Sequence, residues 1–85
     1  MSDLQARFDK ALADSKLLPA KPDNNTLLQM YSLFKQGSVG DATGDRPGFT
    51  DFVGRAKYDA WAALKGKSQD EAKQGYIDLV ESLKK

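Results

Sequence analysis

Two segments of the chain carry a lysine close to aromatic rings, and these groups offer the most specific chemistry in the sequence. Tyr31 and Lys35 are four residues apart in the first segment, while Lys57 lies beside Tyr58 and four residues before Trp61 in the second. At the edge of an apolar helix face, lysine and tyrosine suit a ligand with a phosphorylated head and an apolar tail. The remaining elements are interpreted below as the scaffold that positions these groups.

The composition removes most catalytic and metal-binding chemistry. The chain has no cysteine and no histidine, so a disulfide framework, a thiolate or imidazole zinc site and a nucleophile–histidine pair are excluded. No P-loop pattern and no carboxylate run of the calcium-loop kind occurs. We predict no catalytic residue, no metal and no cofactor. Not every enzyme class is excluded, because carboxylates and lysines are present.

Length and charge set further limits. With 85 residues, we expect one domain over 1–85, with a surface groove rather than a large internal cavity. Thirteen basic and twelve acidic side chains give a formal net charge of +1, so no global field attracts nucleic acid or anionic membrane. No apolar window reaches signal-peptide or transmembrane length, which predicts a cytoplasmic location without stable membrane insertion.

Hydrophobic periodicity predicts four amphipathic helices, no strand and therefore an all-α bundle. The expected starts are Ser2 or Asp3, one of Asp23, Asn24 and Asn25, then Thr50 or Asp51, and Ser68 with Glu71 as a capping box. The expected ends are marked by the prolines at 19 and 22, by Gly37 and Gly40, by Lys65-Gly66 and by Lys84-Lys85.

The connection over residues 37–51 is too long for a simple turn and contains four glycines and one proline. We expect it to let the second and third helices run parallel, which a short loop forbids. Arg46-Pro47-Gly48 predicts a turn with positive φ at Gly48. A phosphate cradle made of glycine amides and Arg46 is an alternative, but the glycine spacing matches no phosphate-loop pattern.

Each candidate group also has a purely structural interpretation. Tyr31 and Tyr76 lie on helical stripes, where tyrosine usually packs in the core with its hydroxyl at the rim. Lys35 and Lys57 lie on helix flanks, where lysine is usually a solvated charge whose stem covers apolar surface. Trp61 is interpreted as a packing residue.

Taken together, the motifs of the central stretch resemble the acyl-CoA-binding protein family. The chain carries, in order and at family spacing, Tyr31, Lys35-Gln36, Val39-Gly40-Asp41, Arg46-Pro47-Gly48, Lys57-Tyr58-Asp59-Ala60-Trp61 and Leu64-Lys65-Gly66. The match continues upstream to Phe8, Lys16 and Lys21-Pro22, and downstream to Ser68, Ala72 and Tyr76-Ile77. It covers nearly the whole chain without a gap.

The resemblance implies an up-down-down-up four-helix bundle that binds medium- and long-chain fatty acyl-CoA esters in a surface site. It implies that Lys35, Lys57 and Tyr76 hold the ribose 3′-phosphate and adenine region. It further implies that Tyr31 contacts the adenine and that Lys16 lies beside the head group.

The acyl channel and its rim fall at Leu28 and Val53 in the same resemblance. Val53 replaces a lysine seen in some members of the family, which removes one head-group charge. Phe34 and Tyr58 also differ from many members but keep an aromatic ring at each position.

We therefore predict a monomeric acyl-CoA carrier and pool former that is not an enzyme. It would deliver its ligand transiently to acyl-CoA-using enzymes and membranes, and it would not bind nucleic acid. The alternative is a small helical protein-interaction module with no lipid ligand, which would bind a partner helix through the flanks at Tyr31 and Trp61.

Overall fold

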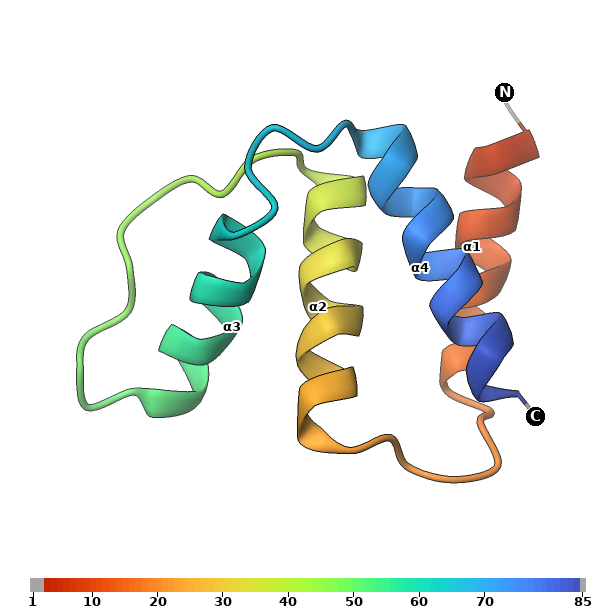
Figure 1. The fold of residues 1–85 in the computed structure, drawn as a ribbon, viewed down its shortest axis with the longest axis horizontal. Helices are drawn as coiled ribbons and strands as arrows, with labels where there is room; N and C mark the ends of the chain where they lie inside the picture. Colours follow the sequence, from red (N-terminus) through yellow and green to blue (C-terminus); the bar gives the residue numbers. More distant parts are fainter. Residues whose placement is uncertain (1–2, 85) are drawn as a thin grey trace.

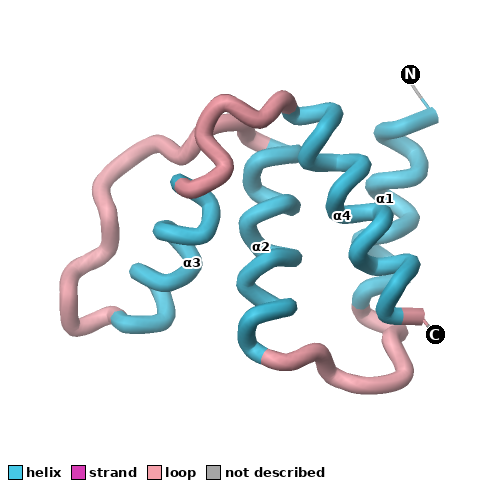
Figure 2. Tube along the Cα trace, in the orientation of Figure 1, coloured by secondary structure: helices cyan, strands magenta, loops and turns pink. Residues whose placement is uncertain are grey.

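A computed structural model describes residues 3–84, and these residues form four α-helices and no strand (Figure 1, Figure 2). The helices are α1 (Asp3–Ser15), α2 (Asn24–Ser38), α3 (Phe52–Ala62) and α4 (Gln69–Leu83). The all-α prediction is confirmed.

The helices follow the expected up-down-down-up order. In Figure 1, α1 and α4 run in one direction, while α2 and α3 run together in the other. Three pairs of described helices pack against each other: α1 with α4, α4 with α2, and α2 with α3. The resulting body is flat, measuring 36 × 30 × 15 Å, and α3 forms one edge of it.

The main hydrophobic core lies among α1, α2 and α4. Its buried members are Phe8, Ala11, Met30, Tyr76, Ile77 and Val80. The Phe8 ring meets the Tyr76 ring edge-on, with centroids 5.4 Å apart, and stacks on Phe34 at 6.2 Å. Helix α3 contributes none of these core residues, and its own buried side chain is Trp61.

Side-chain caps begin three of the helices, as expected from the sequence. Asp23, Asp51 and Ser68 each accept a hydrogen bond from the backbone N–H three residues further on. Glu71 accepts from the Ser68 N–H at 3.2 Å, which completes the predicted capping box. Ser2, one of the two expected caps of the first helix, lies outside the described residues.

The expected end of the third helix is wrong by three residues. Helix α3 ends at Ala62, because Leu64 and Lys65 donate to carbonyls three residues back rather than four. Gly66 follows this tightened turn with φ +92°, a conformation that glycine adopts readily.

The expected positive φ at Gly48 is also wrong. Gly40 and Gly44 have positive φ in the long connection, whereas Gly48 does not. The Gly48 carbonyl instead accepts the Asp51 N–H at 2.9 Å, so the tight turn follows Pro47-Gly48 and leads directly into α3.

A buried amide ties both connections of α3 to the end of α2. Gln36 is fully buried, and its Nε2 donates at 2.8 Å to both the Asp41 carboxylate and the Lys67 carbonyl. Asp41 also accepts the Gly66 N–H, and this bond together with the Gln36 amide lowers the pKa of the Asp41 carboxyl. The loop before α3 and the turn after it therefore meet at one point.

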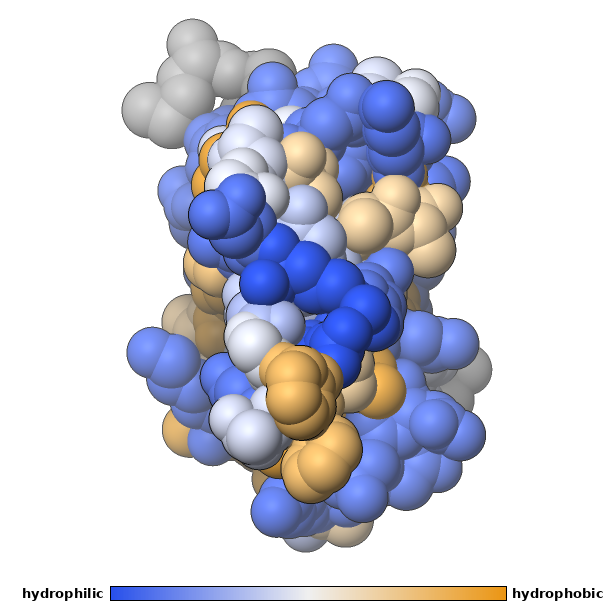
Figure 3. Space-filling view, turned by 90° about the vertical axis from the view of Figure 1, so that its left-hand side faces the viewer, coloured by the Kyte–Doolittle hydropathy of each residue, from blue (hydrophilic) through white to orange (hydrophobic). Residues whose placement is uncertain are grey.

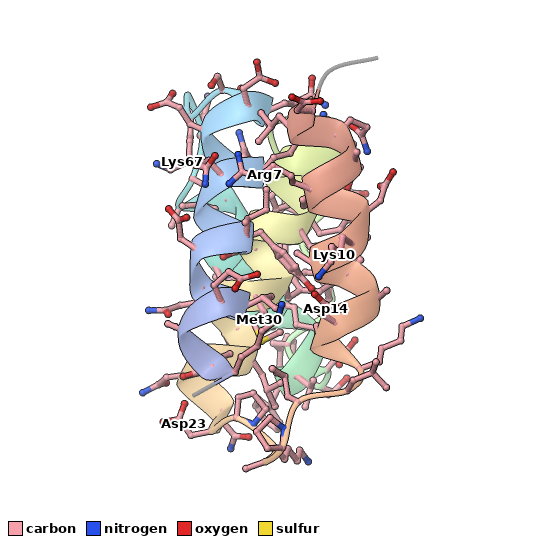
Figure 4. All side chains as sticks on the ribbon, turned by 90° about the vertical axis from the view of Figure 1, so that its right-hand side faces the viewer. Arg7, Lys10, Asp14, Asp23, Met30 and Lys67 are labelled. Atoms are coloured by element: carbon pink, nitrogen blue, oxygen red, sulfur yellow. The ribbon has the colours of Figure 1, made fainter. Side chains whose placement is uncertain are left out.

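An ion-pair network joins α1 and α4 on the opposite edge. Asp14 Oδ2 accepts from Lys10 Nζ at 2.8 Å and from Lys84 Nζ at 2.7 Å, and Lys84 also reaches Glu81 at 2.9 Å. Figure 4 shows the Lys10 and Asp14 side chains pointing toward each other on α1. The two lysines hold the pKa of the Asp14 carboxyl below its usual value.

We predict that Gly37→Val destabilises the fold because α2 and α4 approach closely at this glycine. A Cβ at Gly37 would lie 3.1 Å from Lys73 Cγ and 3.3 Å from Lys73 N. Overpacking of this kind costs about 1–3 kcal/mol, which lowers the Tm of a domain this size by about 4–8 °C per kcal/mol. Thermal unfolding followed by circular dichroism measures it. Gly48→Ala is the control, since no heavy atom lies within 4 Å of its Cβ position; equal Tm losses would refute the close approach.

We also predict that Asp14→Asn makes the protein less sensitive to acid. Because the folded-state pKa of Asp14 is lowered, its carboxylate stabilises the fold above the unfolded-state pKa of about 3.9, and this contribution is lost as pH falls below that value. The variant lacks this titration, so its Tm should fall less than that of the wild type between about pH 6 and pH 2. Asp45→Asn, which removes an exposed loop carboxylate, is the control, and a Tm curve of Asp14→Asn no flatter than that of the wild type would contradict the prediction.

Candidate functional site

An apolar groove lies between the N-terminal ends of α2 and α3. Its volume is about 410 Å³, and it is lined by Asn24, Leu27, Leu28, Phe52, Val53, Ala56 and Lys57. Only Asn24 and Lys57 contribute polar side chains to this lining. Leu28 and Val53, both candidates from the sequence, lie on opposite walls. The volume is within the range of small-molecule sites.

The α3 wall of the groove exposes large apolar side chains. Phe52 and Val53 are 78% and 67% exposed, and Phe49 just before them is 73% exposed. Figure 3 shows the α3 side of the molecule, with apolar side chains exposed in its lower part directly below strongly hydrophilic ones. Apolar surface gathered at one place on a small soluble protein indicates a binding site.

Two lysine–aromatic pairs connect α2 and α3 beside this groove. The Lys57 ammonium lies 5.4 Å from the Tyr31 ring centroid, and the Lys35 ammonium lies 5.0 Å from the Trp61 ring centroid. In each helix the two members are four residues apart, so the pairs are separated by about 6 Å along parallel helices. The structure thus brings Tyr31, Lys35 and Lys57 together, and Lys57 belongs to both the groove and the nearer pair.

Tyr76 lies in the core rather than in the groove. It is 3% exposed, with its ring against Phe8 and Phe34. Its hydroxyl makes no hydrogen bond to the described residues. The Tyr76 ring therefore packs in the core, and a ligand contact through this residue stays a prediction.

Lys16 is exposed and lies in the turn directly after α1. It does not line the groove. Figure 1 places the end of α1 at the same end of the bundle as the starts of α2 and α3, which carry the groove residues. A role beside a ligand head group stays a prediction.

The long connection is fastened to α3 by its own polar groups. Arg46 donates twice to the Asp59 carboxylate, at 2.8 and 2.6 Å, and this pairing lowers the pKa of Asp59. The Tyr58 hydroxyl donates to the Gly44 carbonyl at 3.0 Å. Since the guanidinium is engaged with Asp59, the phosphate-cradle interpretation of this loop has no structural support.

Four groove residues were not among the candidates from sequence: Asn24, Leu27, Phe52 and Ala56. Leu27 and Ala56 lie at helical spacing on apolar stripes, which predicts packing positions; both are half-buried and also line the groove. Phe52 carried a usable signal. It follows Phe49 and precedes Val53, and three large apolar residues around one helix start exceed what a single buried stripe accommodates.

Metal and membrane chemistry find no support in the part of the chain that the structure describes. No cluster of three or more metal-ligating side chains occurs among residues 3–84. None of the described helices combines the length and the apolar character needed to cross a membrane.

Comparison with known proteins gives a consistent picture. Residues 5–80 match the model of a family described as acyl-CoA binding protein. The chain is 50% identical over 76 residues to acyl-CoA-binding protein homolog 1 of Caenorhabditis elegans, which covers 89% of this chain and 88% of that protein. Its fold matches the crystal structure of Oryza sativa acyl-CoA-binding protein 2 with a TM-score of 0.91 and 41% identity, over 95% of this chain and 88% of that one.

A third relative is an enzyme of which this chain matches only a part. This chain is 43% identical over 83 residues to enoyl-CoA delta isomerase 2 of Rattus norvegicus. The matched segment covers 98% of this chain but 21% of that protein. The similarity is therefore confined to a segment about the size of the present chain.

Proposed function

The chain belongs to the acyl-CoA-binding protein family, and from this we propose that it binds medium- and long-chain fatty acyl-CoA esters and carries them as a soluble pool. The observation that supports the proposal best is the position of Lys57. It lines the apolar groove and at the same time faces Tyr31 across the α2–α3 contact. A ligand with an anionic head and an apolar tail can use both parts at once.

The lysines suit the phosphorylated head of the ligand. A phosphomonoester carries nearly two negative charges near neutral pH, so two ammonium groups make charge-assisted hydrogen bonds that one could not match. Lys35 and Lys57 lie over rings on neighbouring helices, about 6 Å apart along the helix axis, and we infer that both reach one phosphate group. We infer that the Tyr31 ring and the Tyr76 hydroxyl contribute beside them, with Lys16 nearer the periphery.

The groove suits the acyl chain. Each methylene removed from water contributes about 0.8 kcal/mol, so six further methylenes add at most about 5 kcal/mol, reduced by chain ordering and partial exposure. Leu28 and Val53 form opposite walls, and Phe52 extends the apolar surface at the rim. Valine at position 53 lengthens the apolar wall without adding a charge.

We infer a carrier role because the groove is a surface feature from which a ligand can leave without unfolding the core. The chain would act as a single, monomeric acyl-CoA-binding domain in the cytoplasm, without a cofactor. It would exchange its ligand transiently with acyl-CoA-using enzymes and membranes and catalyse no reaction itself. Incubation with palmitoyl-CoA tests the last point, since release of free thiol would reveal a thioesterase.

We predict that palmitoyl-CoA binds more tightly than either of its halves. Isothermal titration with palmitoyl-CoA, free CoA and palmitate should rank the ester first, because only the ester uses the lysines and the groove together. Free CoA should bind more weakly but measurably. Palmitate binding as tightly as the ester would contradict the role assigned to the lysines, and no binding of any of the three would favour a protein-interaction module.

We further predict that Lys57→Ala and Tyr76→Phe weaken ligand binding more than folding. Losing a charge-assisted hydrogen bond costs about 1.5–3 kcal/mol, which corresponds to about ten- to hundredfold in Kd for Lys57→Ala. Tyr76→Phe keeps the ring that packs on Phe8 and removes only a hydroxyl without a described protein partner, so its Tm should change little.

Calorimetry with palmitoyl-CoA and thermal unfolding of the same samples give the two readouts. Lys65→Ala is the matched control, because it removes an equal charge from an exposed position beyond the end of α3. Comparable losses in Tm and in affinity would return Lys57 or Tyr76 to a structural role.

A further inference from the structure

The two edges of the molecule hold their lysines in different ways. On the α1–α4 edge, Lys10 and Lys84 pair with carboxylates. On the α2–α3 side, Lys35 and Lys57 lie over aromatic rings, and neither forms an ion pair with a described residue. A carboxylate neutralises an ammonium group and occupies its N–H donors, whereas a ring face attracts the cation and leaves its charge in place.

The Trp61 ring is held in a fixed position against one of these lysines. It is 7% exposed, and its Nε1 donates to the Gly40 carbonyl at 2.8 Å. The Tyr58 ring meets it edge-on, with centroids 6.3 Å apart. The indole plane is therefore held from two sides, and the Lys35 ammonium lies 5.0 Å from its centroid.

We propose that Trp61 is a positioning residue for ligand binding: its ring holds the Lys35 ammonium in place before the ligand arrives, while leaving N–H donors free for a phosphate. The inference rests on the proposed function, because it concerns the same anion site. It gives Trp61 a role beyond packing, although the residue does not touch the groove.

The physical advantage is preorganisation without neutralisation. A free lysine side chain loses several rotatable bonds when a ligand fixes it, and this lowers affinity. Contact with the indole removes part of that freedom in advance. Because no carboxylate has to be displaced, the charge remains available to the incoming phosphate. Tyr31 holds Lys57 in the same way one helical turn away, so both ammonium groups are placed before binding.

A double-mutant cycle on Trp61→Leu and Lys35→Gln, measured by calorimetry with free CoA, tests the proposal. With Lys35 present, Trp61→Leu should weaken binding about two- to fivefold, the range of an exposed cation–π contact. With Gln at position 35, the same change should have no further effect. Trp61→Phe keeps a ring face and should recover most of the loss. Tyr58→Phe is the control, since it keeps the ring that meets Trp61 edge-on and removes only the hydroxyl that donates to the Gly44 carbonyl.

Proton NMR of the ligand-free wild type tests the contact between Lys35 and the Trp61 ring without any variant. It therefore covers the case in which Trp61→Leu fails to fold. The Lys35 side-chain methylene protons should be shifted upfield by the indole ring current. Random-coil shifts for these protons would overturn the proposal.

The outcomes separate the two hypotheses. If the wild type fails to bind CoA or palmitoyl-CoA, the proposed function falls and the inference falls with it. If the wild type binds but Trp61→Leu costs the same in both Lys35 backgrounds, only the positioning role is refuted. A loss of affinity on Trp61→Leu that occurs only when Lys35 is present supports the positioning role.

Discussion

The parallel contact of α3 with α2 is the constraint on which the candidate site depends. Among the described helices α3 packs only on α2, and parallel neighbours require a connection that returns the chain to its starting end. The long loop provides that return. Gln36 then ties the loop and the following turn to α2 through Asp41 and Lys67, while Trp61 reaches Gly40 from α3. Because α2 and α3 run parallel, residues four apart in one helix lie opposite residues four apart in the other. Tyr31 therefore meets Lys57, and Lys35 meets Trp61 one turn further along.

The molecule separates stability from binding. The core of α1, α2 and α4 buries its large apolar side chains, and the Lys10–Asp14–Lys84 network joins the outer edge. Helix α3 buries mainly Trp61 and leaves Phe52 and Val53 exposed. Because these two side chains lie together at the groove, they form an apolar patch of the kind that indicates a binding site. The Tyr76 ring lies in the core, and its hydroxyl has no partner among the described residues.

Charge is organised locally, because the net charge of +1 supplies no overall attraction. Lysines with a structural role have carboxylate partners, whereas the two proposed for the ligand have rings. Arg46 follows the first pattern through its two hydrogen bonds to Asp59, which explains why the glycine-rich loop is a brace for α3. Cationic side chains with a carboxylate partner therefore connect elements of the fold, and Lys35 and Lys57 keep an unpaired charge among the described residues.

Much of this structure was determined by local sequence. The four helices follow from hydrophobic spacing, and the starts at Asp23, Asp51 and Ser68 follow from side chains that satisfy unpaired N–H groups within three residues. The motif order alone indicated the family and three of the residues that now lie together. Two local predictions were wrong, each where a backbone group had two possible partners. The last turn of α3 tightened to bonds three residues back, and the Gly48 carbonyl accepted the Asp51 N–H.

Only the tertiary structure decided how helix faces were shared between the core and the groove. Leu27 and Ala56 have the spacing of buried residues. Whether such a side chain is covered by the neighbouring helix or lines the groove depends on where that helix ends. The pairing of Lys35 with Trp61 is likewise invisible in sequence, since it joins residues 26 positions apart through the direction and level of two helices. Periodicity assigns a side chain to a face of its own helix. The three-dimensional packing determines what that face meets.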